Sequence, residues 1–193
     1  MESIVFASNN AHKLEEVRVK LKDIFRVKSL KEIGCFDDIP ETADTFEGNA
    51  ELKAIWVKEK YNMDCFGDDS GLEIEALDNR PGIYSARYAG ADCSYADNNA
   101  LVMKQLAGIE NRKAHFVTVI CLILNGEVNF FRGEVQGEII TEYRGKEGFG
   151  YDPIFKPLGY DKTFAEMSLE EKNKLSHRAI ALNKMLHFLK ENY

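Results

Sequence analysis

The stretch "AHFVTVICLILNGEVNFFRGEV", residues 114–135, contains two apolar runs on either side of Asn125-Gly126. Asn-Gly favours a two-residue turn with positive φ at both positions, and such a turn matches the twist of two antiparallel strands. The stretch therefore predicts a β-hairpin. Strand-like and helix-like segments alternate in the preceding part of the chain, as in α/β folds. An antiparallel hairpin added to that alternation predicts a mixed α/β sheet and not a purely parallel one.

The segments before the hairpin supply this alternation. Ser3 to Ala7 form a short apolar run that predicts a buried strand, and apolar residues at helical spacing predict a helix over residues 12–25. A second helix is expected over residues 44–61, with Asp44 as its N-cap. The stretch "MDCFGDDSGLEIEAL", residues 63–77, predicts a strand, a tight acidic turn and a second strand.

The remaining elements are a helix, a shaped loop and a C-terminal helical region. A helix is expected over Tyr95 to Ala107, with Gly108 closing it. The stretch "GFGYDPIF", residues 148–155, predicts a loop, because two glycines and a proline disfavour a strand. A helix is expected to start at Ser168, and the C-terminal segment carries an apolar stripe that would cover a sheet.

Length and composition limit the class of protein. The chain has 193 residues, 45% of them hydrophobic and 30% charged, which predicts one folded domain over residues 1–193. The formal charge of −7 and the scattered Lys and Arg argue against a nucleic-acid polymer as the main partner. No signal peptide or membrane-spanning stretch is evident, so we expect a cytoplasmic protein without a membrane partner. The cysteines show no zinc-site spacing and are expected to be reduced structural thiols: Cys35, Cys65, Cys93 and Cys121.

The polar turn "SNNAHK", residues 8–13, lies where a predicted strand meets a predicted helix. Free amides at a helix N-terminus attract anions, and Lys13 would add a positive charge, so the turn could bind phosphate. The turn lacks the Walker pattern, and Ser8, Asn9 and Asn10 could equally be ordinary helix caps.

Acidic residues in two places could hold a metal ion. Asp68 and Asp69 in "GDDSGL" are adjacent, and two crowded carboxylates favour a hard divalent cation such as magnesium or manganese. The alternative is an Asx-type turn. Glu41 lies before the second predicted helix and could complete a metal site, as could Asp44 or Glu47.

Basic and aromatic side chains provide candidates for ligand recognition. Lys53 lies among apolar neighbours, where it would either extend to solvent or meet a phosphate. On one straight helix Lys172 and His177 would point apart, but a break before Ser176 would turn both toward one cleft together with Arg178. The alternative is a charged, solvated helix face.

The loop "GFGYDPIF" could recognise a flat heterocycle. Its aromatic rings could stack on such a ring, and Asp152 would read its edge as a fixed hydrogen-bond acceptor. The alternative is that Phe149, Tyr151 and Phe155 only fill a core.

Six stretches in this order resemble the inosine triphosphate pyrophosphatase family, also called the Ham1 or XTP/dITP diphosphatase family. They are SNNAHK, TFEGNAELKA, GDDSGL, RPGIYSARYAG, GFGYDPIF and TFAEMSLEEKNKLSHR. The resemblance extends from about Ile4 to about Leu189. It implies an elongated mixed β-sheet flanked by helices, with two lobes around a central substrate cleft, and usually a homodimer.

The resemblance also implies an activity and a set of site residues. The activity is hydrolysis of ITP, dITP and XTP to the monophosphate and pyrophosphate, with Mg²⁺ as cofactor and Mn²⁺ as a substitute. Asp69 would be the catalytic base and a metal ligand, with Glu41 as the second ligand. The expected substrate-binding residues are Ser8, Asn9, Asn10, Ala11, His12, Lys13, Lys53, Ser70, Phe149, Gly150, Tyr151, Asp152, Lys172, His177 and Arg178.

One position departs from the family pattern. Many relatives have Phe-x-Glu-Asn-Ala where this chain has Gly48, so any role of that carboxylate in metal binding would pass to Glu47, to Glu41 or to water. Two other functions remain open at this point: a nucleotide sensor without turnover, and a related pyrophosphatase acting on modified pyrimidine nucleotides.

Overall fold

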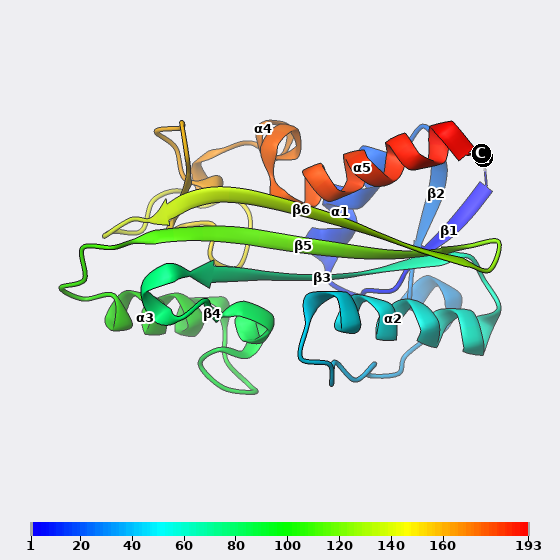
Figure 1. Cartoon of the computed structure of the whole chain (residues 1–193), viewed down its shortest axis with the longest axis horizontal. Helices are drawn as coiled ribbons and strands as arrows, with labels where there is room; N and C mark the ends of the chain where they lie inside the picture. The colour runs from blue at the N-terminus through cyan, green and yellow to red at the C-terminus, as the bar shows by residue number, and fades with distance from the viewer. Residues whose placement is uncertain (1, 193) are drawn as a thin grey trace. The chain divides into compact units, whose positions relative to one another are not determined.

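The computed structural model describes residues 2–192, and the chain divides into two compact units (Figure 1). Unit 1 contains the residues up to Asp69, then Thr118–Gly133, and the residues from Arg178 onward. Unit 2 contains Ser70–Val117 and Glu134–His177. Each unit thus combines segments that are far apart in the sequence.

Strands and helices alternate from β1 to β3, as the sequence predicts for an α/β fold, and the later part of the chain contains consecutive strands and two consecutive helices. The elements are β1 (Glu2–Phe6), α1 (Ala11–Leu21), β2 (Phe25–Ser29), α2 (Phe46–Tyr61), β3 (Cys65–Ile74), β4 (Arg80–Pro81), α3 (Tyr95–Gln105), β5 (Lys113–Leu124), β6 (Glu127–Ile139), β7 (Phe155–Pro157), α4 (Leu169–Leu175) and α5 (His177–Asn192). Short 3₁₀ helices cover Lys31–Ile33, Glu75–Leu77, Gly82–Arg87 and Phe164–Glu166.

The strands form a mixed sheet. Within residues 2–192 the hydrogen-bonded order is β2-β1-β3-β5-β6-β7, and β4 pairs with β3. β1 runs parallel to both β2 and β3, whereas the pairs β3–β4 and β6–β7 are antiparallel. β5 and β6 are joined at Asn125 and Gly126, whose φ values of 52° and 85° fit the predicted turn. The predicted mixed α/β fold with a hairpin is confirmed.

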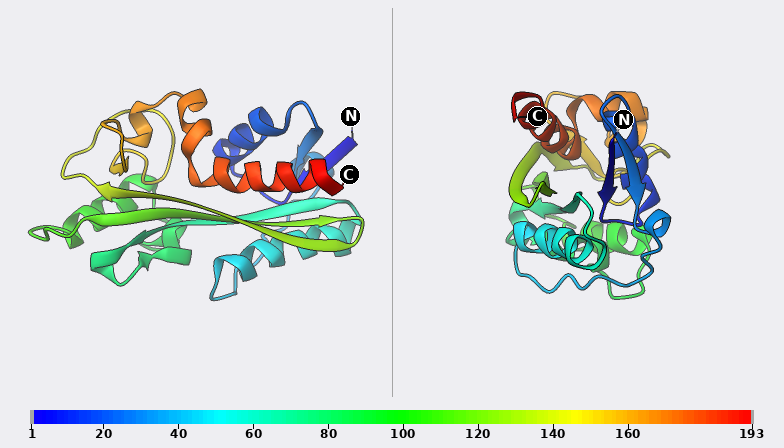
Figure 2. Two further views of the ribbon diagram at one scale, coloured as in Figure 1. Left: turned by 45° about the horizontal axis from the view of Figure 1, so that its top comes forward. Right: turned by 90° about the vertical axis from the view of Figure 1, so that its right-hand side faces the viewer.

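In unit 1, helices cover both faces of the strands. α1 and α5 lie on one face and α2 on the other (Figures 1 and 2). The core on the α1 and α5 side joins Ile4 and Phe6 of β1 to Leu21 of α1 and to Leu182 and Met185 of α5. These side chains follow the helical and strand periodicities of the sequence, so hydrophobic burial explains why α1 and α5 dock on the sheet.

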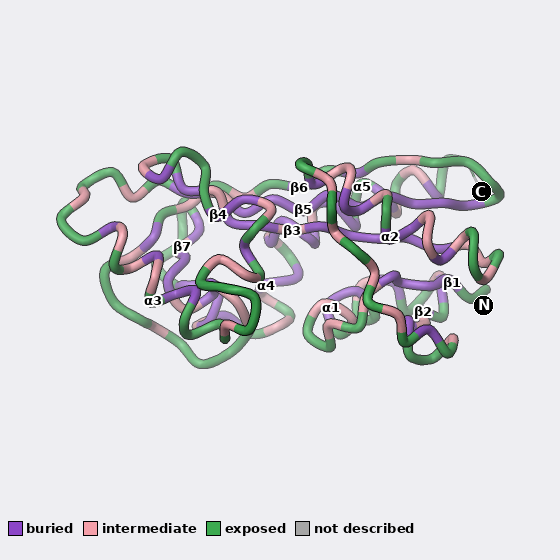
Figure 3. Tube along the Cα trace, turned by 90° about the horizontal axis from the view of Figure 1, so that it is seen from below, coloured by how far each residue is buried: buried purple, intermediate pink, exposed green. Residues whose placement is uncertain are grey.

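Unit 2 has a separate hydrophobic core. It joins Leu72 and Ile74 of β3 to Val102 and Leu106 of α3 and to a group of aromatic rings. The rings are Phe116, Tyr151, Phe155 and Phe164. In Figure 3 the buried residues follow the strands and the inner faces of the helices, whereas exposed residues gather on the loops.

The structure corrects the predicted turn at "GDDSGL". Residues Cys65–Ile74 form one continuous strand, so the strand, turn and strand prediction and its Asx-turn alternative are both wrong. Asp68 and Asp69 are buried inside this strand and are compensated by cationic and amide side chains of other elements. Adjacent charged residues therefore do not indicate a turn when side chains far away in the sequence compensate their charge.

Three smaller predictions about element ends are also corrected. α1 ends at Leu21, and Phe25 begins β2, whose alternating burial is that of a strand. The N-cap of α2 is Thr45 instead of Asp44, because the Thr45 side chain accepts a hydrogen bond from the backbone of Gly48. α3 ends at Gln105, two residues before the predicted end.

Several local predictions hold. Ser168 and Glu171 form the capping box that starts α4, and the extended backbone of Ser176, with ψ of 157°, separates α4 from α5. All four cysteines are free thiols. Among residues 2–192, none of the helices combines the length and apolar character that crossing a membrane requires.

Candidate active site

The turn between β1 and α1 is organised by its polar side chains. Asn10 caps α1 by accepting a 3.1 Å hydrogen bond from the backbone of Lys13, and Ser8 Oγ accepts one of 3.2 Å from the backbone of Asn10. Asn9 Oδ1 accepts from the backbone of Lys31 at 3.1 Å. The capping interpretation is thus confirmed for Asn10. It leaves phosphate binding open, because exposed amides and Lys13 still lie at the start of the helix.

A buried chain of charges connects α1, β3 and α5 in unit 1. Lys13 Nζ lies 2.9 Å from Asp68 Oδ1, and Arg178 Nε lies 3.2 Å from Asp68 Oδ2. Arg178 also donates to Glu16 of α1. Burial alone would raise the pKa of the Asp68 carboxyl, but Lys13 and Arg178 outweigh burial and hold that pKa below its usual range. Asp68 therefore remains ionised and anchors two cationic side chains.

Asp69 points to a different set of partners, as expected for neighbouring residues of one strand. Asn49 Nδ2 of α2 donates a 3.1 Å hydrogen bond to Asp69 Oδ2, and Asn49 Oδ1 accepts from the backbone of Ala43 at 3.0 Å. Lys53 Nζ lies 4.0 Å from Asp69 Oδ1. Burial raises the pKa of Asp69, and the nearby Lys53 and Lys13 only partly offset this effect. The Asp69 carboxylate is thus fixed in position and poorly solvated.

Lys53 brings Glu41 and Asp69 to one place. It donates to Glu41 and is only 8% exposed, so the prediction that it extends to solvent is wrong. Burial disfavours the charged ammonium, but the surrounding carboxylates Asp68, Glu41 and Asp69 raise the pKa of Lys53 overall. A cation in this position is therefore strongly favoured by its surroundings.

These two carboxylates fit a divalent metal ion of the hard, oxygen-binding type. Glu41 and Asp69 already share one cationic group, and magnesium uses one or two carboxylates while retaining several waters. No cluster of three or more His, Cys, Asp or Glu side chains suited to a metal occurs in residues 2–192. Glu47 instead pairs with Arg132 at 3.0 Å. Glu41 and Asp69 are thus the two carboxylates at the Lys53 ammonium, and metal binding by them stays a prediction.

Gly48 lies in a restricted part of α2. A Cβ atom at this position would lie 2.6 Å from the Cβ of Ala43, so any side chain requires the preceding loop to shift. Because Gly48 has no side chain, the preceding loop can approach α2 closely at this point.

In unit 2, the loop at residues 148–152 is closed on itself by Asp152. One oxygen of Asp152, Oδ2, accepts from the backbone of Phe149 at 2.9 Å and from Lys172 Nζ at 2.7 Å. A Cβ atom at Gly148 would lie 2.1 Å from the same oxygen, and φ there is 76°, so the loop requires glycine. Asp152 is 2% exposed, and its hydrogen bonds to Phe149 and Lys172 hold the loop together.

Aromatic rings surround the Lys172 ammonium group. Its Nζ lies 4.7 Å from the centroid of Phe149 and 5.6 Å from that of Phe164. Tyr151 and Phe155 are buried in the core of unit 2, as the core-filling alternative predicts. Gly148 is exposed and Phe149 and Gly150 are partly buried, so residues 148–150 form the accessible part of the loop.

The three residues near the break at Ser176 that were predicted to act together have different partners. His177 stacks on Phe116 in unit 2, with 4.6 Å between ring centroids and 9° between planes. Arg178 contacts carboxylates of unit 1, and Lys172 contacts Asp152 of unit 2. All three are buried, so the solvated-face alternative is wrong. Their meeting in one cleft stays a prediction.

Sequence reasoning missed Glu16 and Asn49. Both are buried polar residues, with 3% and 0% exposure, that fix predicted site residues in place. Glu16 lies three residues after Lys13 in α1, where "HKLEEV" reads as an ordinary helix. No local signal distinguishes Glu16 from its exposed neighbour Glu15, because only the long-range contact with Arg178 buries it.

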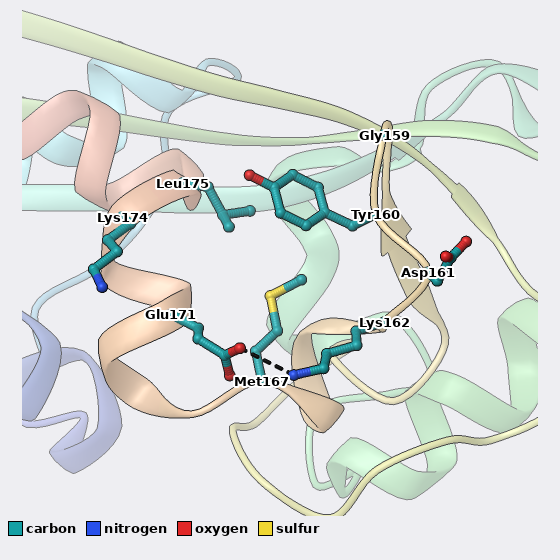
Figure 4. A pocket seen from close by; sticks show the side chains of 8 residues that line it. All are labelled: Gly159, Tyr160, Asp161, Lys162, Met167, Glu171, Lys174 and Leu175. Atoms are coloured by element: carbon teal, nitrogen blue, oxygen red, sulfur yellow. Dashed lines mark hydrogen bonds and ion pairs between the residues drawn. The ribbon is translucent and has the colours of Figure 1, made fainter.

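A pocket of about 430 Å³ lies elsewhere in unit 2 (Figure 4). Its lining includes the apolar side chains of Tyr160, Met167 and Leu175, and Lys162 and Glu171 form a 2.9 Å ion pair beside it. None of the lining residues belongs to the predicted site. The pocket therefore offers positions for control variants.

Comparison with known proteins identifies one family. The Ham1 family model matches residues 4–188. The chain is 50% identical over 186 residues to the dITP/XTP pyrophosphatase of Flavobacterium johnsoniae, covering 96% of this chain and 97% of that protein. It is 50% identical over 190 residues to the protein of the same name from Porphyromonas gingivalis, covering 98% of each.

Solved structures agree with this result. The Ham1 protein of Staphylococcus aureus has a TM-score of 0.90 and 41% identity, with 100% of both chains covered. A HAM1 protein from Coxiella burnetii has a TM-score of 0.90 and 38% identity, with 99% of this chain and 100% of that chain covered. These similarities extend over the whole chain, so they include both units.

Proposed function

Because this chain belongs to the Ham1 family, we propose that it is a pyrophosphatase that hydrolyses deaminated purine nucleoside triphosphates, dITP, XTP and ITP. The products are the nucleoside monophosphate and pyrophosphate, so the reaction removes damaged nucleotides from the pool. Full-length relatives named dITP/XTP pyrophosphatase at 50% identity support this assignment. The structural observation that carries it is the fixed Asp69 carboxylate beside the buried Lys53, with the partly buried Lys13 paired to the neighbouring Asp68.

Asp69 is the general base of the proposed reaction. It takes a proton from the water that attacks the α-phosphorus, and the bond to the leaving pyrophosphate breaks in line with the attack. The hydrogen bond from Asn49 supports this role, because it holds one carboxylate oxygen in place while the other lies on the Lys53 side. An oriented base contributes through position as well as basicity.

The phosphates bind where α1 begins. Lys13 and Lys53 neutralise phosphate oxygens, and the residues from Ser8 to His12 supply backbone and side-chain groups at the helix N-terminus. In the free protein Lys13 pairs with Asp68, which also holds Arg178. Asp68 therefore keeps a cationic partner when Lys13 turns to a phosphate. Ser70 follows Asp69 in β3 and contacts the substrate as well.

The activity depends on a divalent metal ion, which we propose to be Mg²⁺, with Mn²⁺ as a substitute. Glu41 and Asp69 would hold it, since their carboxylates gather around one cation already. When bound, the ion supplies positive charge against the charge that develops on the leaving pyrophosphate.

The purine base lies against the loop of unit 2. Residues 148–150 are its accessible part, while Tyr151 and Asp152 hold the loop from within. Hypoxanthine and xanthine carry a 6-oxo acceptor, which donors from Lys172, His177 or Arg178 match. Adenine presents an amino group to the same donors, so buried polar groups would remain unpaired.

The proposal includes three wider features that rest on the family resemblance. They are a homodimer, a cytoplasmic location and a single functional domain over residues 1–193. Gel filtration with light scattering tests the first of these directly.

A substrate panel tests the proposed function. ITP, XTP, GTP and TTP are compared with magnesium present, and pyrophosphate is distinguished from orthophosphate among the products. Rapid release of pyrophosphate from ITP and XTP, with slow turnover of GTP and TTP, is expected. Guanine shares the 6-oxo group, so slow GTP turnover requires discrimination at the 2-position. Equal rates on all four would contradict selection for the deaminated purines, and fast TTP hydrolysis alone would favour the pyrimidine alternative. Tight binding without turnover would favour a sensor.

A further inference from the structure

Asn99 is a buried polar residue in α3 that contacts the base-binding loop. It is 3% exposed, and its Nδ2 donates a 2.9 Å hydrogen bond to the carbonyl oxygen of Gly150. Asparagine is a weak helix former and is seldom fully buried, so its position inside α3 requires a reason other than helix stability.

The orientation of the Asn99 amide is set by the loop. Rotating the amide by half a turn would bring Oδ1 against the carbonyl oxygen of Gly150, so Nδ2 must face Gly150. The Oδ1 atom is then buried, and no described residue provides it with a hydrogen-bond partner. A buried acceptor without a partner lowers stability. Asn99 therefore stabilises the protein less than a fully hydrogen-bonded residue would, while its Nδ2 holds the loop.

Two further contacts join the same loop to residues that lie shortly before Asn99 in the sequence. The Tyr95 ring, one turn before Asn99 in α3, lies 6.1 Å from the ring of Phe149. The Tyr151 hydroxyl donates a 2.8 Å hydrogen bond to the carbonyl oxygen of Ser85. Three consecutive loop residues, 149 to 151, are thus each held by the segment from Ser85 to Asn99.

The loop is accordingly fixed from two directions. Asp152 is held by Lys172 of α4, whereas Gly150 is held by Asn99 of α3. Gly150 has φ of 61°, a conformation that a flexible glycine leaves easily when no partner holds its carbonyl group. Without Asn99, the accessible part of the loop loses its side-chain hydrogen bond to α3.

We infer that Asn99 is a positioning residue for base recognition: by holding Gly150 it keeps Phe149 in place against the Lys172 ammonium and thereby against the purine. This inference rests on the proposed function, in which the loop contacts the base. Asn99 itself touches none of the reacting atoms. Its loss would weaken binding of the base in ground state and transition state alike, so KM rises while kcat changes little.

The test compares two Asn99 variants with a matched control on the same helix. Asn99→Ala removes the whole amide, whereas Asn99→Leu keeps the branching at Cγ, cannot donate, and eliminates the buried Oδ1. Asn98→Ala is the control, because Asn98 is equally buried but bonds to the backbone of Ala86 and Ala89 and not to the loop. Hydrogen exchange of the peptide covering residues 148–154 is measured in the protein without nucleotide, and kcat and KM are measured with ITP.

Both Asn99 variants are expected to exchange faster in residues 148–154 and to raise KM for ITP by about fivefold to tenfold, the value of one lost hydrogen bond. Asn99→Leu should do so with thermal stability equal to or above that of the parent protein. Asn98→Ala should lower thermal stability with little change in loop exchange or KM.

Two results would overturn the inference. The first is unchanged exchange of residues 148–154 in both Asn99 variants. The second is an equal rise of KM in Asn98→Ala, which would indicate general damage to α3. If the parent protein hydrolyses none of the deaminated purine nucleotides, the proposed function fails and so does base recognition by Asn99, whereas the exchange experiment still decides whether Asn99 holds the loop.

Discussion

Arg178 in the first turn of α5 donates a hydrogen bond to Glu16 in α1, although 162 positions separate them in the chain. The two side chains are 1% and 3% exposed. Asp68 accepts from the same guanidinium group, so three buried charges from three elements of unit 1 compensate one another. Breaking a buried pair leaves an uncompensated charge, which costs more than the pair contributes.

The Glu16→Ala substitution is therefore expected to lower the free energy of unfolding by about 3 kcal/mol. Urea denaturation measures this loss. Glu170→Ala is the control, because Glu170 pairs with Lys174 on an exposed face, where loss of an ion pair changes stability little. Similar losses in the two variants would refute a structural role for the buried pair.

Gly148→Ala is expected to destabilise the protein through a clash with Asp152. The new Cβ would lie 2.1 Å from Asp152 Oδ2, at a φ of 76°. Gly159→Ala is a matched control in the same unit, since its φ is 84° and no atom lies within 4 Å of its Cβ position. Both variants carry the backbone strain of about 1 kcal/mol, and only Gly148→Ala adds a clash of about 1–3 kcal/mol. Equal melting temperatures for the two variants would show that the loop adapts without cost.

The cysteines are expected to differ in reactivity. Burial raises the pKa of both Cys65 and Cys121 to about 12, whereas Cys93 is the one partly exposed cysteine among the four. A charged thiol reagent at pH 8 should label Cys93 first, and the others only after urea is added. Mass spectrometry of the labelled peptides identifies the order. Labelling of Cys65 at the same rate as Cys93 in the folded protein would contradict the burial.

The same shifts predict a decrease of stability at alkaline pH. An ordinary thiol ionises near pH 9.0, and these folded thiols near 12, so above pH 9.0 the unfolded state loses its protons first. The free energy of unfolding should thus fall as pH rises from 9 toward 12. A Cys65→Val variant lacks one of these groups and should show a smaller fall between pH 8 and pH 10 in urea titrations. An identical fall in parent and variant would exclude Cys65 as a contributor.

Local sequence signals predicted much of the fold. The Asn125-Gly126 hairpin, the Ser168 capping box and the break at Ser176 each depend on a few adjacent residues, and each is present. β3 was predicted wrongly because Asp68 is neutralised by Lys13 and Arg178, which lie 55 and 110 positions away. Local polarity cannot reveal a partner at that distance.

The same contrast between local motifs and long-range contacts applies to the candidate site. Asp69, Lys53 and Glu41 were expected together, and the structure brings all three into contact around the Lys53 ammonium. Glu16, Asn49 and Asn99 were not foreseen, because each holds another residue and carries no motif of its own. Side chains that position site residues can be identified only when their burial and their hydrogen-bond partners are known.

The most direct test of the account is hydrolysis of ITP by an Asp69→Asn variant, with pyrophosphate as the measured product. Asp161→Asn, the same chemical change at an exposed residue beside the pocket of Figure 4, is the control. Loss of the base should lower kcat by about a hundredfold or more, while the Asp161→Asn variant keeps parental activity. If Asp69→Asn releases pyrophosphate from ITP within twofold of the parental rate, Asp69 is not the base and the proposed mechanism is wrong.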